Sequence, residues 1–478
     1  MKQWLISNLL GAVNIEQTKL LDFDSLKLIL GTIIPNIHTQ RQALHGLANS
    51  ENIRILQNYN AQFLNAANER DFYFDPHCKH YTGIEKVLKS WFSNTRSIGK
   101  VMHMDFFHTL DGYPLFVKHA DNFYDMRERF TNEIIDFRQV LAIPANQNLT
   151  YFIDRGIYKM ELFEQFQNTN TRIVTWEKGY KKSQWNDSEL SGEFVMTRCR
   201  NNVNDLLLYH FRYIEKLWPK NEIMRNIIVQ ATNPKNRMVE VSILTHDQKR
   251  PAQEIIQPMF NRWVQENDFK YLGDHFGINE ITSYSSIAYT KLKNIVNDRQ
   301  IKSGLYKGLE KEKQKLVNKL KKLLISEQLS QKKDKKRQDK IKQLNQELEI
   351  LKDVMKTTEK EESRLDALIK NQNVRLNTTC KSFMDNLKII ARNMFYKMFQ
   401  PFKKSYNNFR DDHVIFRNLI NSHGLASFGE NCVDIILFPT MRYQPKIRRI
   451  VEEQLHTIND TNPIMPDGSN RRIFFSIE

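Results

Sequence analysis

The spacing of apolar residues along the chain changes near residue 71. Upstream of this point, apolar residues recur three and four positions apart, the spacing that places side chains on one face of a helix. Pro35 separates two such segments, because proline cannot continue a helix through its interior. The first contains Leu20, Leu21, Leu26 and Leu28 to Leu30, and the second runs from Ile53 to Ala67. Residues 1–70 are therefore predicted to be a helical N-terminal region.

From Asp71 onward, apolar and aromatic residues form short runs that predict β-strands. Asp111 and Gly112 supply a hairpin turn between two of them, and Asp125 can cap the helix that follows. In chain order the pattern predicts strands over 72–75, 100–109 and 115–119, a helix over 125–141, a strand over 148–153, a helix over 159–168 and a strand over 172–176. Three strands in a meander, followed by helix, strand, helix and strand, is the order expected of a ribonuclease-H-like core.

Four further strand candidates follow at near-regular spacing, over 193–199, 206–213, 226–231 and 238–244. They predict an antiparallel β insertion over 181–250 that interrupts the core. Helical spacing returns from Ile255 to Phe276, and Pro258 marks a boundary or kink near the start of this helix. The predicted core of this α/β protein therefore comprises residues 71–180 and 251–300.

Neither glycine nor proline occurs between Leu309 and Gln400. Apolar residues in this stretch follow an imperfect heptad spacing, and residues 331–342 carry seven Lys or Arg against two Asp. Residues 301–400 are predicted to form a long helical arm, either one coiled coil or an antiparallel hairpin that turns near Ser330–Asp339. A solvated spacer or dimerisation arm is the favoured interpretation, and direct DNA contact by the basic stretch is the alternative. Residues 401–478 mix strand and helix patterns and predict a small α+β domain.

Charge narrows the range of partners. The 478 residues include 71 Lys and Arg against 55 Asp and Glu, a formal net charge of +16, which favours a polyanionic partner such as nucleic acid. The four cysteines are scattered, which argues against a zinc ribbon or a disulfide framework and fits a reducing compartment. No apolar run reaches the roughly 18 residues of a membrane span, and residues 1–13 lack a signal-peptide pattern. A cytoplasmic protein without a membrane partner is expected.

Three carboxylates stand out by their positions. Asp75 and Asp154 end short aromatic and β-branched runs, whereas Glu266 lies on a predicted helix with Arg262 and Lys270 four residues to either side, on the same face. Two or three carboxylates can hold Mg²⁺, or alternatively Mn²⁺, and a pair of such ions can activate the attacking oxygen and stabilise the leaving oxygen of a phosphodiester. The pattern therefore predicts a two-metal phosphoryl-transfer site formed by the three carboxylates.

Cationic residues near these positions are candidates for DNA contacts. Arg262 and Lys270 share the helix face of Glu266 and are expected to bind DNA phosphates. Arg155 and Lys178 each follow the end of a predicted strand and are further candidates.

Plainer interpretations exist for the same residues. An aspartate at a strand end is often a cap, and Arg262, Glu266 and Lys270 could form an exposed ladder of ion pairs. Asp105, in the middle of the second predicted strand, is the main rival to Asp75 for the first catalytic position.

Five stretches in this order resemble the DDE-type insertion-sequence transposases that have a ribonuclease-H-like core and a β-strand insertion before the catalytic glutamate. They are Phe72–Gly83, His108–Pro114, Phe152–Gly156, Thr175–Tyr180 and Arg262–Lys270, and Pro466–Phe475 resembles that family's closing segment. Each stretch alone is weakly specific, but the five in order are fairly specific. The resemblance covers most of the chain from about residue 70 onward.

The resemblance implies metal-dependent cleavage of DNA at the ends of a mobile element and joining of the freed 3′ hydroxyl to target DNA, by an oligomer of at least two chains. It places the family's three catalytic acids at Asp75, Asp154 and Glu266. The family signature around the glutamate, Tyr-x2-Arg-x3-Glu-x6-Lys, is matched at Arg262 and Glu266. Met259 and Gly273 occupy its tyrosine and distal lysine positions.

Two other functions stay open on sequence alone. A decayed or domesticated relative would bind DNA without transposing, since only about 70 residues, without a clear helix-turn-helix, precede the core. A coiled-coil interaction protein with incidental positive charge would show no convergence of the three carboxylates.

Overall fold

The computed structural model describes residues 1–92, 95–182, 185–282, 285–329, 335–440 and 444–478. The chain divides into two compact units, and each contains segments that are distant in sequence. Unit 1 comprises Met1–Lys79, Met102–Ser283 and Thr378–Glu478, and unit 2 comprises His80–Val101 and Tyr284–Asn377.

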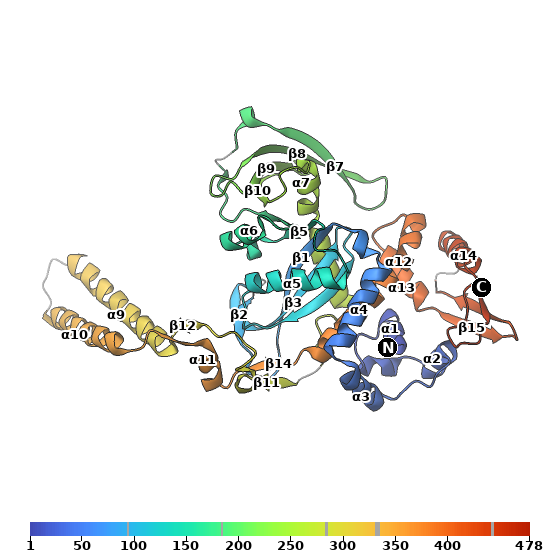
Figure 1. The fold of residues 1–478 in the computed structure, drawn as a ribbon, viewed down its shortest axis with the longest axis horizontal. Helices are drawn as coiled ribbons and strands as arrows, with labels where there is room; N and C mark the ends of the chain where they lie inside the picture. The colour runs from blue at the N-terminus through green and yellow to red at the C-terminus, as the bar shows by residue number, and fades with distance from the viewer. Residues whose placement is uncertain (93–94, 183–184, 283–284, 330–334, 441–443) are drawn as a thin grey trace. The chain divides into compact units, whose positions relative to one another are not determined.

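Unit 1 is built on a large mixed β-sheet (Figure 1). Neighbouring strands follow the order β3-β1-β5-β6-β10-β9-β8-β7, and β4 pairs with β3. The pairs β1–β5 and β5–β6 are parallel, whereas β3–β4, β6–β10 and the remaining pairs out to β7 are antiparallel. The strands are β1 Asp71–His80, β3 Ser97–Thr109, β4 Pro114–Ala120, β5 Leu149–Ile153, β6 Thr171–Trp176, β7 Gly192–Cys199, β8 Leu206–Leu217, β9 Arg225–Thr232 and β10 Met238–Thr245.

The four strands predicted as a β insertion continue this sheet. β10 pairs with β6, with Ile243 opposite Trp176, so the antiparallel strands begin where the parallel ones end. The hydrophobic residues of β9 and β10 are consequently buried in the same apolar cluster as those of β5 and β6.

Both faces of the sheet are covered, which explains the continuous apolar run in β1. Successive side chains of a strand point to opposite faces, so Phe72 and Phe74 pack against Phe130 and Phe137 of helix α5 (Met126–Val140), while Tyr73 lies in a cluster on the other face. The second cluster includes residues of helix α7 (Ala252–Asn261). As predicted, Asp125 caps α5, with its carboxylate accepting from the backbone N–H of Arg127 at 2.9 Å.

A long helix, α12 (Thr379–Tyr406), organises the rest of unit 1. It contacts helices from both ends of the chain as well as strand β4. Pro401, the first residue of the predicted C-terminal domain, lies inside α12, where Phe399 and Phe402 on either side of it are fully buried. The packed helices are α1 Lys2–Leu9, α4 Ser50–Phe63, α8 Trp263–Phe276, α13 Asp412–Ile420 and α14 Pro445–Asp460.

The remaining elements of unit 1 are short. Helices α2 (Phe23–Leu30) and α3 (Ile37–Leu47) flank Pro35, and α6 (Met160–Phe166) connects β5 to β6. At the C-terminus, β15 (His423–Phe428), β16 (Cys432–Phe438) and β17 (Arg472–Ile477) form a three-stranded sheet beside α14.

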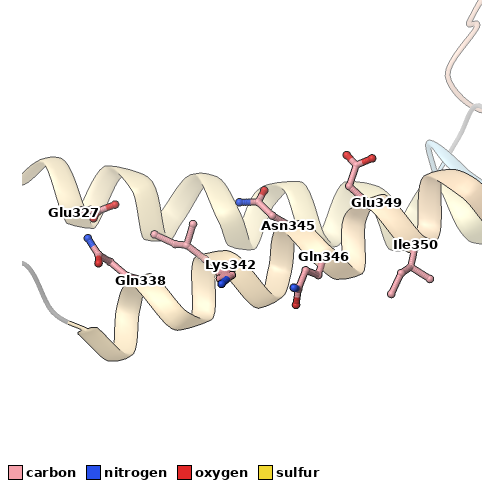
Figure 2. A pocket seen from close by; sticks show the side chains of 8 residues that line it. Glu327, Gln338, Lys342, Asn345, Gln346, Glu349 and Ile350 are labelled. Carbon is pink, nitrogen blue, oxygen red and sulfur yellow. The ribbon is translucent and has the colours of Figure 1, made fainter.

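Unit 2 contains a helical hairpin. Helices α9 (Gly304–Leu329) and α10 (Lys335–Thr357) lie side by side (Figure 2). The Arg337 guanidinium on α10 donates to the Ser326 carbonyl on α9 at 3.0 Å. Gln338, Lys342, Gln346 and Ile350 of α10 line a shallow hollow beside Glu327. The tip of the hairpin, at 330–334, falls outside the described residues.

Short strands and one helix complete unit 2. The strand β2 (Lys89–Phe92) pairs with the first residues of β3, β11 (Ser286–Ala288) with β14 (Val374–Leu376), and β12 (Gln300–Lys302) with β13 (Glu361–Ser363), next to α11 (Arg364–Lys370). Across the described residues of both units, no helix has the length and hydrophobicity needed to cross a membrane.

Candidate active site

Asp75 and Asp154 lie at the same edge of the sheet. Strands β1 and β5 are parallel, and their register pairs Phe74 with Ile153. Each aspartate is the next residue along its strand, so the two carboxylates leave neighbouring strands side by side. The side chain of Asp154 is 44% exposed and that of Asp75 only 17% exposed. Parallel pairing thus brings together two of the three carboxylates singled out in the sequence.

Arg262 links these two carboxylates. Its Nη1 lies 3.1 Å from Asp154 Oδ1, and its Nη2 lies 3.6 Å from Asp75 Oδ1. Arg262 occupies the break between α7 and α8, four residues beyond the boundary expected at Pro258. Pro258 itself stays inside α7, and its carbonyl accepts a hydrogen bond from Tyr73 Oη at 2.8 Å.

Glu266 lies one turn further along α8 and is exposed. The negative charge of Glu266 is one of those that raise the pKa of the Asp75 carboxyl. Lys270, a further turn along the same helix, is also exposed. The helix face predicted from the four-residue spacing is therefore the face that carries Arg262 to the strand ends.

The pKa of Asp75 is raised to about 7. Burial is the largest cause, because it disfavours the charged form of a carboxyl. The negative charges of Asp154 and Glu266 add to the effect, whereas the guanidinium of Arg262 opposes it. Near neutral pH, Asp75 is therefore divided between its protonated and ionised forms. A second positive charge nearby would favour the ionised form.

Asp105 has a different environment from Asp75. Its side chain is fully buried, and its two oxygens accept from Nε and Nη2 of Arg129 at 3.0 and 3.2 Å. A carboxylate held by both arms of a guanidinium has little free capacity for another ligand. The contacts favour Asp75 over Asp105 as the residue that faces Asp154.

The two remaining DNA-contact candidates are exposed. Arg155 begins the 3₁₀ turn Arg155–Ile157 directly after Asp154. Lys178 follows the end of β6, which lies at the same sheet edge because β5 and β6 are parallel. Between β6 and Lys178, the buried Glu177 accepts from Trp218 Nε1 at 3.0 Å and from Ser242 Oγ at 2.8 Å, which anchors this turn to the sheet.

Polar residues on α8 that sequence reasoning missed lie on its buried side. Gln265 and Asp268 are almost fully buried and both contact His108 of β3, at 3.2 Å through Gln265 Nε2 and at 3.1 Å through Asp268 Oδ2. Burial lowers the pKa of His108, and a neutral imidazole can accept from Gln265 while it donates to Asp268. Arg392 of α12 forms an ion pair with Asp268 Oδ1 at 2.6 Å. These contacts fix the rotation of the helix that carries Glu266.

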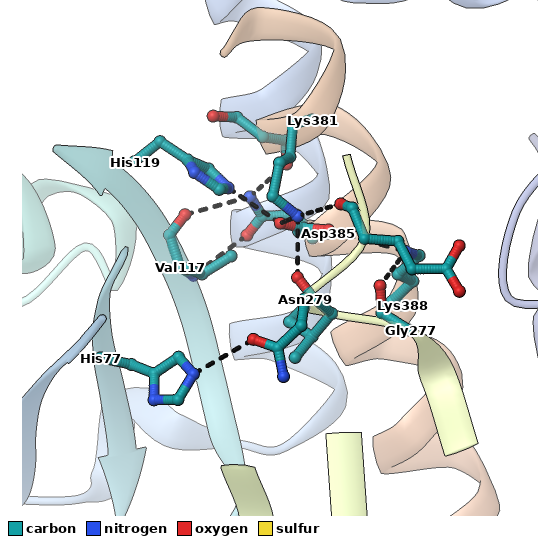
Figure 3. Close-up of polar contacts among 12 residues, drawn as sticks. His77, Val117, His119, Gly277, Asn279, Lys381, Asp385 and Lys388 are labelled. Carbon is teal, nitrogen blue, oxygen red and sulfur yellow. Dashed lines mark hydrogen bonds and ion pairs between the residues drawn. The ribbon is translucent and has the colours of Figure 1, made fainter. Parts of the chain in front are cut away.

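The loop after α8 is held by two buried lysines of α12 (Figure 3). Lys388 Nζ donates to the carbonyl of Gly277 at 2.7 Å, and Lys381 Nζ donates to the carbonyls of Ile278 and Glu280, both at 2.7 Å. The last carbonyls of a helix lack partners within the helix, so ammonium groups beside them stabilise its C-terminal end.

One carboxylate, Asp385 of α12, balances the charge of these lysines. Its Oδ2 lies 2.8 Å from Lys381 Nζ and accepts from His119 Nε2 of β4, also at 2.8 Å (Figure 3). Burial would raise the pKa of Asp385, but the neighbouring cations and His119 outweigh it and hold that pKa below its ordinary value. Burial lowers the pKa of Lys388 to about 8. The cluster therefore ties α8, α12 and β4 together through charge.

A pattern in the sequence could have indicated this role of α12. Lys381, Asp385, Lys388 and Arg392 are spaced by four, three and four residues, so they share one helix face. Buried apolar residues, including Phe383, Leu387 and Ile389, occupy the rest of the helix surface, so this part of α12 has no apolar-free side that would face water.

A family model described as "Transposase protein" matches residues 19–477. The chain belongs to this transposase family. A comparison with curated proteins gives no match. Among solved structures, the chain is similar to a cryo-EM structure of the piggyBac transposase synaptic complex with hairpin DNA, at 8% identity and a TM-score of 0.27. That match covers 44% of this chain and 41% of the other, less than half of its length, and at this TM-score it supports no conclusion about mechanism.

The donor set of the site suits a divalent cation. Within the described part of the chain, no three His, Cys, Asp or Glu side chains are already gathered as metal ligands. Asp75, Asp154 and Glu266 nevertheless offer carboxylate oxygens, which Mg²⁺ prefers, and Arg262 supplies the positive charge between the first two. The Nε of Arg262 is buried without a hydrogen-bond partner.

The raised pKa of Asp75 predicts a pH-dependent loss of stability. An unfolded carboxyl ionises near the ordinary value of 3.8 and the folded one near 7, so the folded state binds the extra proton between these values and stability falls as pH rises through this window. Asp75→Asn removes the effect, which is at most about 4 kcal/mol at 1.36 kcal/mol per pKa unit. The thermal midpoint of the variant, measured without divalent metal, should rise relative to wild type from pH 4 to pH 7.

Asp434→Asn, which changes an exposed carboxylate on β16, is the matched control and should leave the pH dependence unaltered. If Asp75→Asn and wild type lose stability in parallel across this pH range, the proposed environment of Asp75 is wrong.

The ion pair between Arg392 and Asp268 predicts strong coupling. Arg392→Met leaves Asp268 buried without its cation, and breaking one partner of a buried pair costs about 3–5 kcal/mol. Adding Asp268→Asn removes the unpaired charge and keeps a group that can bond to His108. The double variant should therefore melt at a higher temperature than Arg392→Met alone. Additive losses in a double-mutant cycle followed by thermal unfolding would show that the pair is not coupled.

Proposed function

We propose that this member of the transposase family is a DDE-type enzyme that cleaves DNA at the ends of a mobile element and joins the freed 3′ end to target DNA. Its catalytic carboxylates are Asp75, Asp154 and Glu266. The observation that supports the proposal is the pairing of β1 with β5, which sets Asp75 beside Asp154, with Arg262 in contact with both carboxylates and Glu266 one helical turn beyond Arg262.

The strand order supports a ribonuclease-H-like core. Along the chain, β1, β3 and β4 precede α5, and β5, α6 and β6 follow. In the sheet, β1 lies between β3 and the parallel pair β5–β6, with β4 beside β3. In this arrangement Asp154, the residue after β5, lies beside Asp75, the β1 residue that follows the last pair of the β1–β5 register.

The three carboxylates would hold Mg²⁺ or Mn²⁺. When bound, a pair of such ions activates the attacking oxygen and stabilises the leaving oxygen of the phosphodiester. The chain itself supplies three things: the buried carboxyl of Asp75, the more exposed carboxylate of Asp154, and the cation of Arg262. Arg262 partly neutralises the two aspartates in this structure. If a bound cation took over that role, the guanidinium of Arg262 would be available to a phosphate, which its forked donors fit.

DNA is the proposed partner, bound as element ends and as target. Lys270 on α8, Arg155 after β5 and Lys178 after β6 are exposed at or near the edge where the carboxylates lie. They would contact phosphates rather than bases, and so position the strand without reading its sequence. Cutting two ends and joining both to one target requires two sites, so we propose an assembly of at least two chains. The α9–α10 hairpin would serve as its spacer or dimerisation arm.

Replacing the carboxylates tests the chemistry. Asp75→Ala, Asp154→Ala and Glu266→Ala should each lower Mg²⁺-dependent cleavage of a plasmid that carries the DNA flanking the gene on both sides. We expect a loss on the order of 100-fold or more, the scale on which single electrostatic groups act in active sites. Gel analysis of cleaved ends measures the loss, and the thermal midpoint of each variant shows whether the fold survives.

Asp434→Ala, which removes an exposed carboxylate on β16 far from α8 in sequence, should cleave like wild type. Undiminished cleavage by Asp154→Ala would overturn the assignment. A wild-type protein that binds the flanking DNA but never cuts it, with all three carboxylates in place, would instead identify a decayed or domesticated relative.

A further inference from the structure

The α9–α10 hairpin of unit 2 carries a continuous stripe of lysines. Lys307, Lys311, Lys315, Lys319 and Lys322 are spaced by four, four, four and three residues along α9, so their side chains share one helix face. All five are exposed. We call them the lysine stripe.

The lysine stripe points away from the partner helix. The half-buried residues of α9, which include Leu309, Leu316, Leu320 and Leu323, lie on the opposite face, where α10 packs. Buried Leu344 and Leu348 of α10 belong to the packed side of the hairpin. Because α10 already covers the apolar face of α9, the lysine face is left for another partner.

No acidic residue interrupts the stripe. At 100° per residue, the positions that fall between the five lysines on this face are Gly304, Gly308, Asn318, Ile325 and Ser326. None of the five lysines forms an ion pair with a carboxylate among the residues described for this hairpin, whereas Lys302, Lys352 and Lys356 are paired with Glu310, Glu349 and Asp353. The positive charge of the stripe is therefore not balanced within the hairpin.

We propose that the lysine stripe is a DNA-backbone contact surface, separate from the residues around Asp75. Lysines one turn apart lie about 6 Å from each other along a helix, and the whole stripe spans about 22 Å. Duplex DNA presents one phosphate charge about every 1.7 Å of its axis, so this length of duplex offers more charges than the stripe needs. The ammonium group of a lysine lies on a flexible side chain and can contact a phosphate without contacting the bases.

The partner is nucleic acid rather than a membrane surface because α9 has no free apolar face beside the lysine stripe. A helix that lies in a membrane interface combines cations on one face with a free apolar face on the other. Here the apolar face of α9 is covered by α10. The inference rests on the proposed function for the presence of DNA, but it concerns binding and not cleavage.

The test uses the full chain and a random-sequence duplex without element ends. Replacing all five stripe lysines by glutamine removes the charges while keeping similar helix propensity. Since each phosphate contact contributes about 0.9 to the magnitude of the slope of log K against log salt concentration, losing five contacts should lower that magnitude by up to about 4.5. Fluorescence anisotropy at several salt concentrations measures it, and circular dichroism checks that the hairpin remains helical.

A matched variant removes the same number of charges elsewhere on the hairpin. It replaces Lys321, Lys335, Lys340, Lys342 and Lys356, all exposed and outside the stripe, by glutamine. Its slope should stay within about 1 of wild type. Equal losses in the two variants would mean that only net charge matters, and that result overturns the proposal.

Two further outcomes separate this inference from others. If the stripe variant loses binding to phosphatidylserine vesicles but keeps its full slope with DNA, the surface serves a membrane and the DNA assignment is wrong. If wild type never cleaves flanking DNA yet the stripe variant loses the predicted slope, the proposed catalysis fails while the lysine stripe stands.

Discussion

The parallel pairing of β1 with β5 is the constraint on which the site depends. Side chains alternate along a strand with a period of two, so a shift of one residue would turn Asp75 toward the opposite face from Asp154. The register is held by hydrophobic packing on both faces of the sheet. Phe72 and Phe74 are locked against α5, Tyr73 and Phe152 against the other layer, and no aromatic side chain of this size can change face without opening the core. Hydrophobic packing therefore determines where two negative charges meet.

Charge, in turn, determines how α8 lies on this sheet. Arg262, directly before its first residue, contacts the aspartates, the buried side of the helix contacts His108 and Arg392, and the carbonyls of the loop after it accept from Lys381 and Lys388. Such buried charges are costly to desolvate and contribute little net stability compared with apolar residues. They are directional, however, so they define one rotation and one depth for the helix that carries Glu266.

The sequence predicted the strands of the sheet because they depend on local patterns. Continuous apolar runs mark β1 and β5, so the sequence placed Asp75 and Asp154 directly after them, although β1 itself continues past Asp75 to His80. The network on α12 was not predictable in the same way. Lys381, Asp385 and Arg392 were assigned to a solvated arm because charged residues usually face water, and their partners lie more than 100 residues away along the chain. The break also lies at Arg262 rather than at Pro258. The Pro258 carbonyl, which would accept from the N–H of residue 262 in a continuous helix, accepts from Tyr73 instead.

The bond from Lys388 to the carbonyl of Gly277 spans 111 residues. During synthesis, α8 leaves the ribosome well before the residues that satisfy its buried aspartate and its terminal carbonyls. Until α12 is complete, Asp268 and the carbonyls of the loop after α8 lack the cations that contact them in the folded chain. Burying these groups without such partners would be unfavourable. The region around Asp75 and α8 is therefore not a module that could be shortened from its C-terminal side. A chain that stops before residue 392 would contain all three carboxylates and still lack the means to hold them in register.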